Sequence, residues 1–108
     1  MTFEEQLYTI ISQRIRDKRK YLNISQEEIA NKLNVSRASI SNMETGKHQV
    51  SVISIFELCP IFNCEIFDLI PKFDEVYSQL EYSNSKSFNT LEETQKVSIE
   101  KIIKDIEL

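Results

Sequence analysis

Residues 26–43 constrain the fold more than any other stretch, because two independent helix signals meet there at a sharp corner. Ser25 followed by Glu28 predicts a capping box, in which the serine oxygen accepts an amide hydrogen bond while the glutamate reaches back. Asn34 tolerates the left-handed backbone that ends such a helix, and Ser36 is a favoured N-cap for a second one. The pattern therefore predicts two short helices joined by a tight turn.

Apolar residues in this stretch are spaced so that the two helices share a buried face. Ala30 lies where a crossing second helix leaves room for no more than a methyl group. We expect the core side of the pair to consist of Ile29, Leu33, Val35, Ile40 and Met43. These five side chains are therefore assigned no contact with a partner.

This arrangement resembles the helix-turn-helix of the phage repressor and Cro family, also called XRE-type regulators. The resemblance depends on Gln26, Ala30, the corner at Asn34 and the apolar spacing, and it continues with residues 44–47. It covers about residues 11–70, and it departs from the family at Asn34, where glycine is usual. The resemblance implies an all-α fold, a five-helix repressor-like DNA-binding domain with a helix-turn-helix, here followed by a C-terminal helical extension.

Charge is unevenly distributed along the chain. The formal net charge of −4 by itself argues against a nucleic-acid partner. However, residues 1–50 hold eight Lys and Arg against six Asp and Glu, whereas residues 51–108 hold five against eleven. The acidity belongs to the distal half, so a basic face on the first half can meet phosphates.

Several classes of protein are disfavoured by what the sequence lacks. It has no run of about 18 apolar residues and no signal-peptide character at its start, so we expect a cytoplasmic protein without a membrane span. Cys59 and Cys64 with a single histidine cannot form a four-ligand metal set, and we interpret them as small buried hydrophobes; a redox switch is the alternative. No nucleophile–base pair or phosphate-cradling glycine loop is recognisable, so we expect no enzyme and no cofactor.

Periodicity outside the central pair predicts further helices. They span residues 2–22, with a capping box at Thr2 and Glu5, and residues 51–62, 65–70 and 72–80. The helix over 51–62 is mostly apolar and is expected to be buried, with Pro60 causing a kink or early termination. Gly46, the only glycine, is placed where a helix C-terminus requires it. We divide the chain into a DNA-binding domain, residues 1–71, and a helical tail, residues 72–108.

The tail is predicted to contain a serine-rich linker, residues 82–89, and then an amphipathic helix. The apolar stripe of that helix is formed by Ile99, Ile102, Ile103 and Ile106. A lone helix cannot bury such a stripe, so it must dock on its own domain, on a second copy or on another protein. Because one reading helix covers too few base pairs, we expect a homodimer, with this stripe favoured over residues 62–70 as the dimerisation surface.

The docking mode of helix-turn-helix proteins assigns roles to individual residues, since the second helix of the pair enters the major groove. Candidate base contacts are Arg37, Ala38, Ser41 and Asn42. Candidate contacts to the DNA backbone are Ser25, Gln26, Ser36, Lys47 and His48, the last being equally well a bystander. The resemblance also pairs Arg19 with Glu44 as a structural ion pair. The other basic residues of the first helix are either a solvated face or a phosphate-facing edge: Arg14, Arg16, Lys18 and Lys20.

These features together favour a sequence-specific DNA-binding transcriptional regulator, expected to be a repressor acting as a homodimer on double-stranded DNA. The alternative keeps the DNA-binding half but makes the C-terminal helix a docking site for another protein, as in an antitoxin that binds a toxin or a regulator controlled by an antagonist. The isolated apolar stripe and the acidic distal half motivate this second hypothesis.

Overall fold

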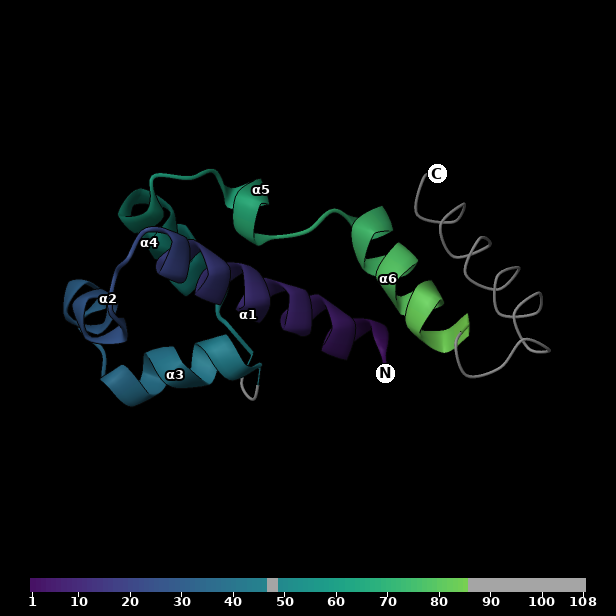
Figure 1. Cartoon of the computed structure of the whole chain (residues 1–108), viewed down its shortest axis with the longest axis horizontal. Helices are drawn as coiled ribbons and strands as arrows, with labels where there is room; N and C mark the ends of the chain where they lie inside the picture. The colour runs from purple at the N-terminus through teal and green to yellow at the C-terminus, as the bar shows by residue number, and fades with distance from the viewer. Residues whose placement is uncertain (47–48, 86–108) are drawn as a thin grey trace.

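The computed structural model describes residues 1–46 and 49–85, and within these ranges the chain forms six helices and no strand (Figure 1). The helices are α1 (Phe3–Tyr21), α2 (Gln26–Leu33), α3 (Arg37–Thr45), α4 (Val52–Phe62), α5 (Ile66–Leu69) and α6 (Phe73–Ser85). The predicted all-α class is confirmed. Lys47, His48 and the isoleucine stripe of residues 99–106 lie outside the described residues. No described helix combines the length and the apolar character that crossing a membrane requires.

Helix α1 is the longest element, and α3, α5 and α6 all pack against it (Figure 1). The predicted capping box starts it: Thr2 Oγ1 accepts from the Glu5 amide and Glu5 Oε2 accepts from the Thr2 amide, both at 3.1 Å. Its inward side buries Ile11 and Ile15 in the shared core. The helix therefore serves as the support on which the other elements are positioned.

The corner between α2 and α3 has the predicted backbone. Asn34 is left-handed at φ 56° and ψ 46°, and the Ser36 side chain caps α3 by accepting from the Ser39 amide at 3.1 Å. Ser25 likewise accepts from the Glu28 amide at 3.0 Å. The predicted return bond from the Ser25 amide to the Glu28 carboxylate is not formed. Instead, the Ser25 hydroxyl donates to Glu28 Oε1 at 3.5 Å.

One residue of the core predicted for α2 and α3 is not buried. Ile29 and Ile40 are fully buried, and Leu33 and Met43 pack partly buried against the core. The prediction for Val35 is wrong, since 40% of it is exposed. Its amide closes the corner on the Ala30 carbonyl at 2.9 Å, which holds the residue at the outer edge of the turn.

Helix α4 differs from expectation in two respects. Early termination at Pro60 is wrong: the helix continues to Phe62 and ends at left-handed Asn63, whose amide bonds to the Cys59 and Pro60 carbonyls. The expected burial holds for one side only, where Ile55, Leu58 and Phe62 are buried and α4 packs against α2 and α5. Its other side exposes Val52 by 63%, Ile53 by 70% and Phe56 by 58%.

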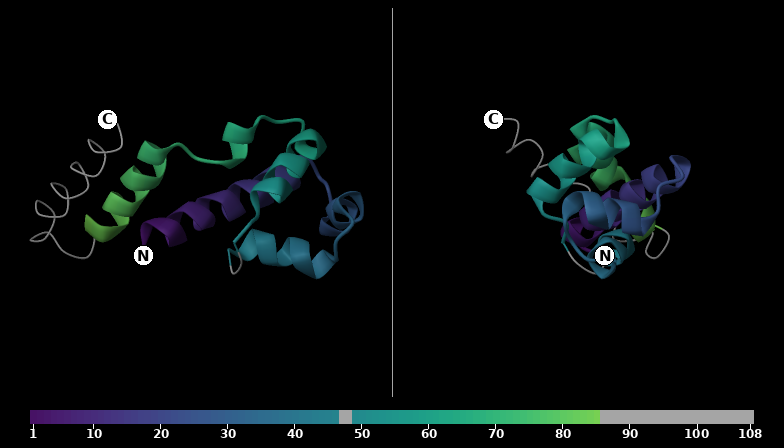
Figure 2. Two further views of the ribbon diagram at one scale, coloured as in Figure 1. Left: turned by 180° about the vertical axis from the view of Figure 1, so that it is seen from behind. Right: turned by 90° about the vertical axis from the view of Figure 1, so that its left-hand side faces the viewer.

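Helix α6 is longer than predicted, since it runs to Ser85 and includes the first four residues assigned to the linker. It lies beside the N-terminal half of α1, as the left-hand view of Figure 2 shows, and buries Val76 and Leu80. The rings of Phe3 and Phe73 are 5.2 Å apart. Helix α6 is thus attached to α1 from the first turn of α6 onward.

Candidate nucleic-acid interface

Helix α3 presents one open face and one buried face. It lies along an edge of the molecule (Figure 1), with Ile40 and Glu44 buried on its inner side. On the outer side Arg37 and Ala38 are exposed, and Ser41 and Asn42 are partly exposed. The structure therefore brings the four candidate base-contacting residues onto one accessible stretch of a single short helix.

A buried ion pair fixes the orientation of this helix. Arg19 of α1 donates from Nε to Glu44 Oε2 at 2.6 Å and from Nη2 to Glu44 Oε1 at 2.9 Å. A further bond from Nη1 to the Ile24 carbonyl, 3.1 Å, ties the guanidinium to the start of the α2 segment. The side chains of Arg19 and Glu44 are only 14% and 3% exposed. Hydrogen bonding to the Glu44 carboxylate raises the pKa of Arg19 above its ordinary value, and these charge-assisted bonds hold α3 against α1.

Gln26 belongs to the same network. Its Nε2 donates to Glu44 Oε1 at 3.2 Å, so the carboxylate receives hydrogen bonds from two different elements. Gln26 is a candidate contact to the DNA backbone, but the structure gives its side chain an internal partner. The Ser25 hydroxyl is similarly engaged in capping α2. Contact with DNA by either residue would then use the backbone amides of the first turn of α2, which suit an anion.

The remaining candidate backbone contacts divide into two groups. Ser36 is exposed at the start of α3, where its hydroxyl caps the helix and lies 2.9 Å from the Ser39 hydroxyl. Lys47 and His48 lie outside the described residues, directly after the left-handed Gly46 that ends α3. The structure therefore shows Ser36 exposed at the start of α3, whereas Lys47 and His48 remain a prediction from the sequence.

A cavity of about 250 Å³ adjoins the open face of α3, at the meeting point of α1, α2 and α3. Its lining residues are Arg16, Arg19, Lys20, Gln26, Ser41, Glu44 and Thr45. For Arg16 and Lys20 the sequence left open a solvated face or a phosphate-facing edge, and their four-residue spacing places both on one side of a helix. The structure thus links this side of α1 to the candidate base-contacting residue Ser41.

The two cysteines lie away from this face, at the end of α4. Both are free and partly buried, and burial together with the neighbouring Cys59 raises the pKa of Cys64 to about 11. A neutral thiol is a poor metal ligand and a poor nucleophile. Among the described residues, no group of three or more His, Cys, Asp and Glu side chains is arranged to hold a metal ion.

Comparisons with known proteins concern mainly this half of the chain. The sequence model of a family described as helix-turn-helix matches residues 15–69. Two Archaeoglobus fulgidus proteins, each described as an uncharacterized HTH-type transcriptional regulator, are 37% and 36% identical over 62 residues. These matches cover 57% of this chain and 89% and 86% of the relatives. The crystal structure of the restriction-modification controller protein C.AhdI from Aeromonas hydrophila superposes with a TM-score of 0.55 and 27% identity, covering 58% of this chain and 96% of that one.

Proposed function

Because the chain belongs to the phage repressor and Cro-type (XRE) helix-turn-helix family of transcriptional regulators, we propose that it reads a specific DNA sequence through α3 and represses transcription as a homodimer. The observation that carries this proposal is the open face of α3, which the buried Arg19–Glu44 pair holds against α1. A rigid helix with an exposed polar face suits the major groove. Repression needs no catalytic group, since occupying a promoter excludes polymerase.

Each outward residue of α3 has a distinct role in this proposal. Arg37 donates two hydrogen bonds to guanine O6 and N7, and Asn42 bonds adenine at N6 and N7. Ala38 contacts a thymine methyl group, and Ser41 bonds a base edge at the side nearer α1. The first-turn amides of α2, together with Ser36, Lys47 and His48, would hold the DNA backbone and set the register.

The homodimer is proposed because two half-sites about 34 Å apart are needed for useful selection by such a small reading helix. One proposed contact between the two copies is the isoleucine stripe of residues 99–106 in the tail, residues 72–108. The described residues offer a second surface, the exposed side of α4 formed by Val52, Ile53 and Phe56. This side is largely apolar, its one charged residue is the exposed Glu57, and it has no basic residue, so it suits a copy of itself better than a phosphate backbone.

Selection of bound sequences from a random duplex pool tests the reading function. We expect an enriched consensus with two-fold symmetry and half-site centres one helical turn apart. Enrichment of one half-site without a symmetric second one would support sequence-specific binding by α3 but contradict the homodimer. Failure to enrich any sequence at low salt would contradict the proposal as a whole.

Light scattering on the full chain tests the dimer and locates its surface. Ile103→Lys places a charge on the tail stripe, and Ile53→Lys places the same charge on the open side of α4. If only Ile103→Lys disrupts the dimer, the interface lies in the tail. If only Ile53→Lys disrupts it, the interface lies on α4. A monomer in the unsubstituted chain contradicts the homodimer and favours the alternative, in which an antitoxin or antagonist-controlled regulator docks another protein on its tail.

A further inference from the structure

Two basic residues of α1 stand on the side of that helix next to α3. Arg16 and Lys20 are both exposed, and both line the cavity between α1, α2 and α3. The ion pairs among the described residues join Arg14 to Glu75 and Arg19 to Glu44, so neither Arg16 nor Lys20 takes part in one. Two unpaired cations thus face the same hollow.

The charge of this cavity is not balanced by its acidic residue. Glu44 is the one carboxylate that lines it, and Glu44 accepts two hydrogen bonds from Arg19 and one from Gln26. The Arg19–Glu44 pair therefore neutralises itself, and the charges of Arg16 and Lys20 remain. An occupant of this cavity should carry negative charge.

The size of the cavity fits a single phosphate group. Its volume is about 250 Å³, whereas one water in the liquid takes about 30 Å³, so a phosphate fits with part of its hydration shell. A guanidinium recognises phosphate oxygens with a planar fork of donors, and a lysine ammonium binds them as a point charge. The pair supplies both kinds of contact.

The position of the cavity connects it to DNA. Ser41 lines the cavity and lies one helical turn after Arg37, so the hollow opens beside the face of α3 that would meet base edges. The sugar-phosphate strands form the two walls of the major groove, and a helix inside the groove has a wall on either side. From these observations we propose that Arg16 and Lys20 clamp a backbone phosphate of the DNA strand that runs along the α1 side of α3. This inference rests on the proposed function.

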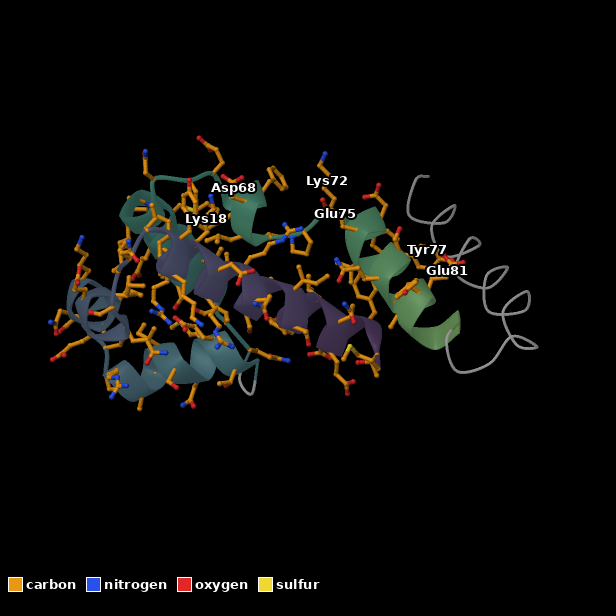
Figure 3. The ribbon with its side chains drawn as sticks, in the orientation of Figure 1. Lys18, Asp68, Lys72, Glu75, Tyr77 and Glu81 are labelled. Atoms are coloured by element: carbon orange, nitrogen blue, oxygen red, sulfur yellow. The ribbon has the colours of Figure 1, made fainter. Side chains whose placement is uncertain are left out.

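The same helix provides a matched control. At about 100° per residue, Lys18 points to the side of α1 opposite Arg16 and Lys20. It lines a different hollow together with Asp68, and Figure 3 shows it beside Asp68 on the side of α1 that faces α5. Lys72, labelled in the same figure, precedes α6 and is likewise separated from α3 by α1. Removing Lys18 and Lys72 changes the net charge by as much as removing Arg16 and Lys20.

The experiment compares the full-length double variants R16Q/K20Q and K18Q/K72Q. Affinity for the selected duplex and for a scrambled duplex is measured over a range of salt concentrations. Each phosphate contact contributes about 0.9 to the steepness of log K against log salt, so the first variant, which loses the one phosphate shared by Arg16 and Lys20, should lose about 0.9 per bound protomer. It should weaken both duplexes by the same factor, because phosphate contacts carry no sequence information. The control variant should keep the slope of the unsubstituted protein.

Other outcomes separate this inference from the function on which it rests. Equal slopes for the two variants would overturn the clamp while leaving sequence reading intact. A loss confined to the selected duplex would also overturn it, since Arg16 and Lys20 would then be reading bases. Absence of binding by the unsubstituted protein would instead overturn the proposed function. Unchanged circular dichroism and melting temperature in both variants show that any loss of affinity arises at the interface.

Discussion

Replacing Glu44 by glutamine tests whether the Arg19–Glu44 pair holds the reading helix in place. The Glu44 carboxylate accepts hydrogen bonds of 2.6, 2.9 and 3.2 Å, two from Arg19 and one from Gln26, and its side chain is 3% exposed. The substitution preserves shape but removes the charge, and it turns one acceptor into a donor that faces the guanidinium. Removing one partner of a buried pair costs about 3–5 kcal/mol, because the other charge remains buried.

Such a loss is large for a small domain, whose free energy of unfolding is about 5–15 kcal/mol. Urea denaturation followed by circular dichroism measures it directly. With a slope of about 1–3 kcal/mol/M, the midpoint should fall by at least about 1 M. Replacing both partners by methionine should recover much of the loss, since no buried charge is then left alone.

The matched control is the same substitution in the exposed pair. Arg14 and Glu75 are 3.1 Å apart, but their side chains are 27% and 45% exposed, so solvent screens their attraction. Glu75→Gln should therefore change the urea midpoint far less than Glu44→Gln. Equal midpoints for the two variants would refute the reasoning, because burial would then make no difference to the two pairs.

Two further predictions concern the corner of the helix pair and the thiols. Asn34→Ala should lower stability by about 1 kcal/mol or more in thermal melts, because alanine tolerates the observed φ of 56° poorly, whereas Asn34→Gly should not; equal losses would show that the left-handed backbone is not the cause. Cys64 should be alkylated about 100-fold more slowly at pH 8 than an unperturbed thiol, because its pKa is raised from 9.0 to about 11. The raised pKa of Cys64 also contributes to the stability of the fold. This contribution is complete below 9.0, the pKa of the thiol in the unfolded chain, and should fade as pH rises through about 11. Peptide mass spectrometry measures the rate, and a rate equal to that of the urea-unfolded chain would contradict the burial of this thiol.

The parts of the fold that depend on local chemistry could be predicted from the sequence. Thr2, Ser25 and Ser36 cap helices because their side-chain oxygens reach amides only a turn away. Asn34 and Gly46 end helices because few residues adopt a left-handed backbone at little cost. These rules need no knowledge of distant contacts, which is why both helices of the motif were predicted at the correct place.

The parts that depend on packing could not be predicted in this way. The apolar composition of α4 did not reveal that Val52, Ile53 and Phe56 would be left uncovered, because nothing local says how many neighbours a helix has. A kink or early termination was expected at Pro60, yet α4 continues to Phe62, where the carbonyls of Cys59 and Pro60 accept the Asn63 amide and complete the last turn. Periodicity specifies which side of a helix is apolar, and the tertiary arrangement decides what covers it.

The candidate site shows the same division. The outward position of Arg37 follows from the register of α3, but the internal bond from Gln26 to Glu44 does not follow from sequence spacing. The cavity that joins Arg16 and Lys20 to Ser41 likewise exists only once α1 and α3 are in contact. A basic run on a helix therefore became a specific phosphate-binding hypothesis only through the structure.

The most direct test of the account is the affinity of Arg37→Ala for the selected duplex and for a scrambled one, with Arg14→Ala as a control on the side of α1 that faces α6. If Arg37 contacts a guanine from the major groove, its loss should weaken binding to the selected duplex by about 1–3 kcal/mol and relax the preference at one base position. Binding to the scrambled duplex should change much less. Equal losses on both duplexes would contradict the claim that α3 reads the sequence.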